Sequence, residues 1–329
     1  MRFSTSRRKA LAGVIGGLGA AGLASCGKAA IIGLDKRARS LDIAIQDEPL
    51  TLDPQKCSAP AENLIVGNMF MGLFAENARA EPIPGMAERW EVSEDGLTWT
   101  FFLRPATWSD GVRCDAHDFV YAFRRILDPA HAAEYARLLF PLKNAAQVNK
   151  GEAPPSAVGV AALGDRILEI QLEHPTPLLP QVLKHHVAYP APKHVLEAHG
   201  DDWIKAENIV VNGPYTLVKW WSNYVVHLRK NPHFLDAGQV RLNDLYFYPT
   251  ANAASAARGV ESGARGWSTD FPSDRYNDLE RRLSAYVRVA PNLLTECFFF
   301  NCTRAPFDDP RVRQALCMSL DRDFIFSRV

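Results

Sequence analysis

Residues 87–129, AERWEVSEDGLTWTFFLRPATWSDGVRCDAHDFVYAFRRILDP, constrain the fold more than any other stretch of this sequence. Residues 97–103 alternate bulky and polar side chains, which is the pattern of a strand with one buried face. Asp-Gly pairs at 95–96 and 110–111 predict tight turns, because glycine adopts the positive φ that other residues avoid. The stretch therefore predicts a β-hairpin followed by a second turn.

The same stretch ends in a predicted helix. Asp115 stands where an N-cap belongs, and Asp118 follows three residues later, near the exposed amides of the first turn. Apolar residues then recur at helical spacing, at Phe119, Ala122, Phe123 and Ile126. Together these patterns predict a compact unit of mixed α and β structure.

Similar patterns predict elements elsewhere. We expect strands at residues 41–45, 158–163, 167–172 and 239–248. We expect helices at residues 62–74, 178–184, 195–200, 252–261 and 310–320. The last of these has Asp309 as its cap, Pro310 at its first position and an apolar stripe at Val312, Ala315, Leu316 and Leu320.

Charge and composition exclude one class of function. The chain has 329 residues with 37 basic and 37 acidic side chains, so no net positive charge draws it to nucleic acid. With 47% hydrophobic residues it can bury a sizeable core, and its length favours two domains.

The first 26 residues have the pattern of an export signal. Basic residues at 7–9 precede a Gly/Ala/Leu run too short to span a membrane, and Leu-Ala-Ser-Cys closes it at Cys26. The closing tetrapeptide resembles a bacterial lipobox, with Cys26 as the lipidated residue. The twin arginines resemble a Tat signal, but Ala10 departs from that pattern, so Sec export stays open. A literal G-x-G-x-x-G at 17–22 lies inside this segment, without the preceding strand that a dinucleotide site needs.

No pattern of cysteines or histidines predicts a metal site. Beyond Cys26 there are five cysteines, so at least one stays a free thiol unless it pairs between chains. Cys297 and Cys302 are expected on one strand about 16 Å apart, too far for a disulfide. His185 and His186 are adjacent, so we expect their side chains to point to different faces and not to share a metal ion.

Several motifs of the sequence resemble those of a known family. These motifs are W-x-x-S-x-D-G-x-x-x-x-F-x-L-R from residue 90, W-S-D-G at 108–111, A-x-D-F-V-Y at 116–121, L-D-P at 52–54, NIVVNGPY at 208–215 and APFDDPRVRQAL at 305–316. They are similar to the oligopeptide/dipeptide-binding family of extracytoplasmic solute receptors for ABC importers. The resemblance implies an α/β fold of mixed α and β layers, with the two lobes typical of periplasmic binding proteins.

The resemblance also implies a division of the chain. Residues 1–25 would be the signal peptide and 26–40 a tether. Residues 41–70 and 195–294 would form the larger subdomain of the first lobe, and 71–194 its small subdomain. Residues 290–301 would include the strand that crosses between lobes, and 295–329 would begin the second lobe. We therefore expect a nearly complete first lobe and a largely missing second lobe.

The resemblance implies a ligand site as well. In relatives, the segment after L-D-P lies along the bound peptide, which maps Ser58, Ala59 and Pro60 to the cleft wall. Tyr135 falls where peptide binders carry a tyrosine that faces the ligand. An ordinary surface loop and a packed tyrosine are the alternatives.

The function that the resemblance implies is capture of oligopeptides outside the cytoplasmic membrane and delivery to ABC permease subunits. We expect a location in the periplasm or cell envelope, attachment to a membrane through a lipid anchor, and no nucleic-acid partner, cofactor, metal or catalytic activity. The motifs G-x-S-x-G, H-E-x-x-H and G-x-x-x-x-G-K-[ST] do not occur. A truncated relic that no longer transports, and a receptor for a non-peptide solute, are the alternatives. Because one lobe cannot close around a ligand, we expect weak peptide binding or none, with exposed apolar side chains at 298–300 and 310–320.

Overall fold

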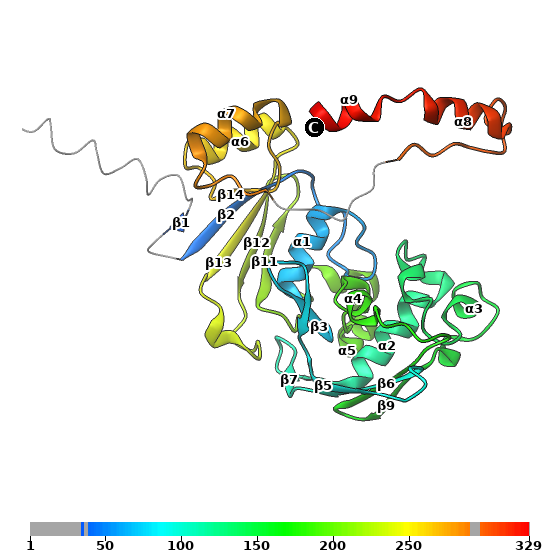
Figure 1. Ribbon diagram of the computed structural model, residues 1–329. Helices are drawn as coiled ribbons and strands as arrows, with labels where there is room; N and C mark the ends of the chain where they lie inside the picture. Colours follow the sequence, from blue (N-terminus) through cyan, green and yellow to red (C-terminus); the bar gives the residue numbers. More distant parts are fainter. Residues whose placement is uncertain (1–33, 36–38, 290–296, 329) are drawn as a thin grey trace, which may run out of the picture. The chain divides into compact units, whose positions relative to one another are not determined.

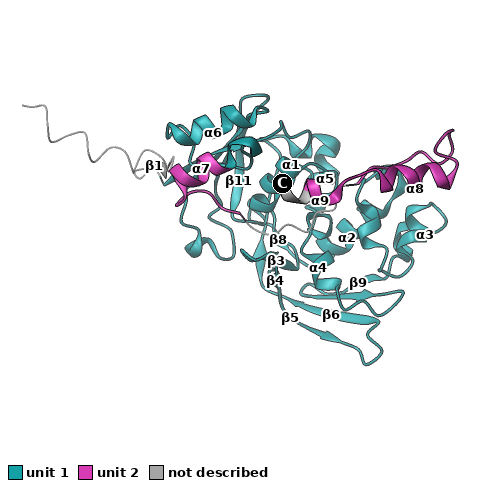
Figure 2. Ribbon diagram, turned by 45° about the horizontal axis from the view of Figure 1, so that its top comes forward, with its two compact units in different colours: residues 1–276 teal, residues 277–329 magenta. Residues whose placement is uncertain are grey.

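A computed structural model describes residues 34–35, 39–289 and 297–328 of the chain. The chain divides into two compact units, residues 1–276 and residues 277–329 (Figure 2). The expected signal segment, including Cys26, lies outside the described residues.

The first unit contains a mixed sheet of six strands (Figure 1). Its order is β1 (Leu34–Asp35), β2 (Ser40–Ile45), β13 (Asp244–Pro249), β12 (Val225–Lys230) and β11 (Tyr215–Trp221), with β14 (Trp267–Ser268) also pairing with β2. β2 runs parallel to β13 and β14, whereas β11, β12 and β13 are antiparallel neighbours. Strands from both ends of the unit therefore meet in one sheet.

A second sheet of the same unit is antiparallel and contains the strands formed by residues 87–103. Its order is β5 (Ala87–Val92), β6 (Thr98–Leu103), β10 (Ile167–Gln171) and β9 (Val160–Gly164). The predicted hairpin is confirmed, and Gly96 in its turn has a φ of +72°. Two further antiparallel pairs of strands form separate two-stranded sheets: β3 (Phe74–Glu76) with β4 (Pro82–Pro84), and β7 (Ala106–Thr107) with β8 (Arg113–Cys114).

Helix α2 (Ala116–Leu127) lies against β9 and β10 of this sheet. Its predicted cap is confirmed, because the Asp115 carboxylate accepts from the His117 amide and Asp118 accepts from the Asp115 amide. The four predicted apolar residues of its stripe, Phe119, Ala122, Phe123 and Ile126, are all buried. The amphipathic pattern therefore packs α2 onto the sheet.

The remaining helices are shorter. The other α-helices are α1 (Pro60–Met69), α3 (Ala145–Asn149), α4 (Leu179–Leu183), α5 (Lys193–His199), α6 (Ala253–Glu261), α7 (Tyr276–Leu283), α8 (Pro310–Met318) and α9 (Arg322–Arg328). The 3₁₀ helices are Pro129–His131, Ala136–Leu139, Pro155–Ala157, His186–Ala188, Gly200–Ile204, Ala237–Gln239 and Ser273–Arg275. The expected division of the first unit into a larger and a small subdomain stays a prediction.

Three predicted elements differ from the structure by more than two residues. The helix expected at 62–74 is α1, which begins at Pro60 and ends at Met69, because Phe70 is extended and Phe74 pairs in β3. The strand expected at 239–248 begins at Asp244, since Val240 and Leu242 pack against the core without pairing. Alternation of apolar residues reports burial, and pairing needs a neighbouring strand in register as well.

The strand expected at 290–301 is the third correction. Residues 290–296 lie outside the described part, and residues 297–301 form no strand. Cys297 and Cys302 are therefore not strand residues, and both are exposed free thiols. An apolar run becomes a strand only where another backbone edge pairs with it.

The described part of the second unit carries exposed apolar side chains on a short helix. α8 is capped by Asp309, whose carboxylate accepts from the Arg311 amide as expected. Ala315, Leu316 and Leu320 of its stripe are exposed, and Phe299 is 93% exposed.

Across residues 34–35, 39–289 and 297–328, no helix combines the length and the apolar character that crossing a membrane requires.

Candidate ligand-binding site

The loop of residues 53–60 enters α1 and is tied to α2 by a buried ion pair. Asp53 is 2% exposed, and its two carboxylate oxygens accept from the Arg125 guanidinium at 3.2 and 2.6 Å. Arg125 also donates to Gln55 Oε1 at 2.5 Å, and Gln55 Nε2 donates to the Ala122 carbonyl at 2.6 Å. Because the Asp53 carboxylate is buried, the Arg125 side chain is only 13% exposed and the geometry is bidentate, this pair fixes the position of the loop against α2.

A second buried carboxylate holds the end of the loop. Glu62 is 1% exposed, and its two oxygens accept from three backbone amides: Leu50 at 2.8 Å, Ser58 at 2.8 Å and Ala59 at 2.9 Å. An ionised carboxylate with several amide donors is a strong, charge-assisted arrangement. Ser58 and Ala59 are therefore held in one backbone conformation before any ligand arrives.

This network limits what the loop can offer to a ligand. The amides of Ser58 and Ala59 are used by Glu62, and Pro60 has no amide proton. The Ala59 carbonyl accepts from the Asn63 amide at 3.0 Å. What remains is the second lone pair of each carbonyl oxygen and the Ser58 hydroxyl, so residues 58–60 present mainly acceptors.

Tyr135 lies beside this loop. Its hydroxyl donates to the Ser58 carbonyl at 3.4 Å, so the structure brings two of the predicted site residues together. Its ring is partly buried and makes edge contacts with His185 and His186, with ring centroids 5.8 and 6.2 Å apart. Ala59 is partly exposed, and Pro60 is exposed at the first position of α1. Their roles toward a ligand stay a prediction.

The expectation that His185 and His186 point to different faces is wrong. Their ring centroids are only 4.1 Å apart, because His185 is extended while His186 begins a 3₁₀ turn, and this bend brings the rings to one side. His186 Nδ1 is 2.5 Å from the Pro54 carbonyl, so it carries a proton and donates to the loop. The histidines therefore support the loop from the side of Tyr135.

Burial keeps both imidazoles neutral at pH 7. Burial, with smaller contributions from His186 and Lys184, lowers the pKa of His185 to about 4. Burial also lowers the pKa of His186, although its bond to the Pro54 carbonyl opposes the shift. A protonated imidazole here would lose its hydration, which disfavours the charged form, so the rings that support the loop are neutral.

The described residues contain no group of three or more histidine, cysteine or acidic side chains placed to hold a metal ion. Cys57 and Cys114 are buried free thiols, and burial raises the pKa of both. A buried, protonated thiol is a poor nucleophile.

Sequence reasoning missed Glu62, Arg125 and the histidine pair as supports of the loop. Glu62 was detectable, since a proline at the first helical position and a glutamate two residues later indicate a helix start at residue 60. Arg125 and His186 lie 72 and 132 residues from their loop partners, and no local pattern connects them.

The geometry can be compared with known proteins. Residues 81–329 match the family model of bacterial extracellular solute-binding proteins, family 5 Middle. The chain is 36% identical over 286 residues to the periplasmic oligopeptide-binding protein OppA of Salmonella typhimurium, covering 86% of this chain and 52% of that protein. It is 35% identical over 285 residues to the probable deoxycholate-binding periplasmic protein YgiS of Escherichia coli, covering 86% of this chain and 53% of that protein.

Solved structures agree with these matches. The structure of Haemophilus influenzae OppA in complex with the peptide RPPGFSPFR superposes with a TM-score of 0.85 at 33% identity, covering 90% of this chain and 58% of that one. The murein tripeptide binding protein MppA of Escherichia coli gives a TM-score of 0.83 at 32% identity, covering 88% of this chain and 57% of that one. The expected mixed α/β fold is confirmed, and the chain spans just over half the length of the relatives it matches.

The family resemblance seen in the sequence is confirmed over most of the chain, and the protein belongs to the family 5 bacterial extracellular solute-binding proteins.

Proposed function

We propose that this protein captures oligopeptides outside the cytoplasmic membrane for uptake by an ABC importer. The carrying observation is the likeness to OppA of Haemophilus influenzae in complex with a nonapeptide, at a TM-score of 0.85 and 33% identity. The solute would meet Ser58, Ala59, Pro60 and Tyr135 on the first unit. The protein would act as a binding component and not as an enzyme.

The geometry of the loop supports this proposal in a specific way. An extended peptide offers one amide donor and one carbonyl acceptor at each residue. Residues 58–60 present mainly acceptors, so they suit the amide protons of a peptide better than its carbonyl oxygens, to which only the Ser58 hydroxyl could donate. Because Glu62, Arg125 and the histidines already fix the loop, little conformational entropy would be lost on binding.

The cellular setting of the proposal rests on the relatives and on the sequence. Several relatives are named periplasmic binding proteins, among them OppA of Salmonella typhimurium and OppA and MppA of Escherichia coli. We propose a location in the periplasm or cell envelope, a lipid anchor on Cys26 and delivery of the solute to permease subunits. Mass spectrometry of the mature N-terminus tests the anchor, and an unmodified Cys26 in a protein exported by its native host would contradict it.

The peptide site is tested by nuclear magnetic resonance titration of the chain with RPPGFSPFR, which detects weak as well as tight binding. We expect the largest shifts at the amides of Ser58, Ala59 and Tyr135. Tyr135→Ala should weaken binding by about fivefold or more, because a flat aromatic contact is lost. Tyr135→Phe, which keeps the ring, should lose less.

Tyr224→Ala is the matched control. Tyr224 is an exposed tyrosine of the same unit, at the turn between β11 and β12. It should leave the titration unchanged. Shifts that avoid residues 58–60 and 135 would overturn the assignment of the site.

A non-peptide solute is the second candidate. It is favoured by the 35% identity to the probable deoxycholate-binding protein of Escherichia coli. A parallel titration with deoxycholate, below the concentration at which it forms micelles, distinguishes the two. Shifts at residues 58–60 with deoxycholate and none with the peptide would favour this second function.

A further inference from the structure

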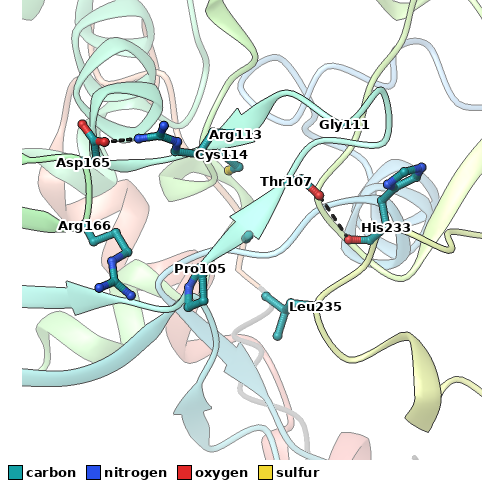
Figure 3. A pocket seen from close by; sticks show the side chains of 10 residues that line it. Pro105, Thr107, Gly111, Arg113, Cys114, Asp165, Arg166, His233 and Leu235 are labelled. Atoms are coloured by element: carbon teal, nitrogen blue, oxygen red, sulfur yellow. Dashed lines mark hydrogen bonds and ion pairs between the residues drawn. The ribbon is translucent and has the colours of Figure 1, made fainter.

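A pocket far along the chain from residues 58–60 lies between three segments of the first unit. Its volume is about 710 Å³. The β7–β8 hairpin, the turn between β9 and β10 and the loop of residues 231–236 each contribute to its lining (Figure 3). The volume lies within the range of about 300–1,000 Å³ that is typical of small-molecule sites.

Each wall of this pocket is fixed by hydrogen bonds. In the turn, the Asp165 carbonyl accepts from the Ala116 amide at 2.8 Å, and the Arg166 carbonyl accepts from the Leu103 amide at 2.9 Å. In the hairpin, the Ser109 amide donates to the Val211 carbonyl at 2.8 Å. The pocket is therefore formed before a ligand enters it.

The third wall, the loop of residues 231–236, is held by an ion pair and a hydrogen bond. Both terminal nitrogens of Arg104 donate hydrogen bonds to the Asp236 carboxylate, at 2.9 and 2.7 Å. The Thr107 hydroxyl donates to the His233 carbonyl at 3.5 Å. The bidentate pair holds the loop of residues 231–236 against the end of β6. The lining side chains thus keep their places relative to one another.

The lining combines an apolar surface with a single uncompensated charge. Pro105, Ala106 and Leu235 supply apolar contacts. Arg113 forms an ion pair with Asp165 on one side of the pocket, as Figure 3 shows, so their charges cancel. Arg166 lines the same side, and its guanidinium has no ion-pair partner among the residues that the structure describes.

The balance of charge defines the class of ligand. Counting histidine as neutral at pH 7, the pocket carries a net charge of one positive unit, from Arg166. A planar guanidinium without a partner is suited to a carboxylate, which it binds through two parallel hydrogen bonds. An apolar body on the ligand would cover the proline, alanine and leucine side chains.

We propose that this pocket binds a small organic monocarboxylate, with its carboxylate on Arg166 and its apolar body against Leu235 and Pro105. The site is separate from residues 58–60 and would be occupied independently of a peptide. The failure of one proposal therefore leaves the other intact.

The test compares three probes that share one body and differ in charge: 4-phenylbutyrate, 4-phenylbutylamine and 4-phenylbutanol. Each is titrated into the full chain and followed by nuclear magnetic resonance. We expect 4-phenylbutyrate to shift the amides of residues 106–107, 111–114, 165–166 and 233–235. Equal shifts with the amine or the alcohol, or shifts elsewhere only, would overturn the proposal.

Variants of Arg166 make the test sharper. Arg166→Glu should weaken 4-phenylbutyrate binding by about tenfold or more, whereas Arg166→Lys should retain most of it. Arg241→Glu is the matched control, since Arg241 is exposed, lies outside the pocket and should leave the affinity unchanged. The Arg166 side chain has no ion-pair partner to lose, so Arg166→Glu should fold, which its melting temperature checks. Unchanged affinity in a folded Arg166→Glu protein would contradict the proposal.

Discussion

At the scale of single residues, the buried carboxylates Glu62 and Asp118 differ in how far their hydrogen-bond donors compensate for lost hydration. Glu62 is buried and accepts from three backbone amides, so its charge is compensated by fixed donors. Asp118 is also buried, but it accepts from the Trp108 indole at 3.0 Å and the Asp115 amide at 3.1 Å with the same oxygen. Burial raises the pKa of Asp118 from 3.8 to about 6, since these two donors do not replace the lost water.

The raised pKa of Asp118 predicts a pH dependence of stability. Below about pH 4 the carboxyl is protonated in both states, and between about pH 4 and pH 6 the folded state retains the proton that the unfolded state loses. Stability from this group therefore falls as the pH rises through that window, by about 3 kcal/mol in total. Asp118→Asn cannot titrate, so its unfolding free energy relative to the parent should rise by about that amount between about pH 4 and pH 7.

Urea unfolding of both proteins at several pH values measures this difference. Groups that titrate in both proteins, His185 among them, cancel in the comparison. A flat difference for Asp118→Asn would show that its carboxyl is not destabilised by burial.

At the scale of elements, the end of α1 depends on a distant turn. The Asn212 side chain accepts from the Met71 amide at 3.0 Å and donates to the Met71 carbonyl at 2.9 Å. The Gly213 amide donates to the Met69 carbonyl at 2.8 Å. The Asn-Gly-Pro turn therefore terminates α1, and through α1 it helps to place the loop of residues 53–60.

Gly213→Ala should destabilise the protein strongly. A Cβ atom at this position would lie 2.5 Å from the backbone carbon and oxygen of Met69, and backbone atoms cannot give way as a flexible side chain can. We expect a loss of about 3 kcal/mol or more, at the upper end for overpacking. Gly238→Ala is the control, since its Cβ would meet nothing within 4 Å. Equal midpoints of urea unfolding for the two variants would refute the close contact.

At the scale of the whole molecule, the protein combines a large first unit with a smaller second one. The chain covers 52% of Salmonella typhimurium OppA. Its second unit exposes Phe298, Phe299 and Met318 among the described residues. Exposed apolar surface of this kind favours association between molecules.

We expect the chain to self-associate in a concentration-dependent way through this surface. Phe299→Ser should raise the dissociation constant by about tenfold, because a phenyl group that would be buried on association is removed. Sedimentation velocity over a range of concentrations measures the effect. Leu50→Ser, at a leucine of the first unit that is 85% exposed, should leave association unchanged. A parent protein that stays monomeric throughout would contradict this expectation.

Much of the fold was predictable because its signals are local. The hairpin of β5 and β6, the Asp115 cap and the buried stripe of α2 follow from turn glycines, a capping side chain and helical spacing within a few residues. The family resemblance could be detected for a related reason, since its motifs are continuous in sequence. At residues 239–243 the prediction failed because apolar patterning indicated burial where no partner strand pairs. Residues 297–301, which the resemblance placed on a strand, form none and are largely exposed.

The mixed α/β fold and the family could be read from the order of the amino acids, which also pointed to Ser58, Ala59, Pro60 and Tyr135 as candidate positions. How those positions are held depends on the packing of the folded chain, because the supports come from residues remote in sequence. Arg125 reaches Asp53 across 72 positions, and His186 reaches Pro54 across 132. The same holds for the pocket at Arg166, whose lining comes from residues 105–114, 165–166 and 233–235. Local chemistry specifies elements, whereas charge pairing and burial between distant segments specify sites.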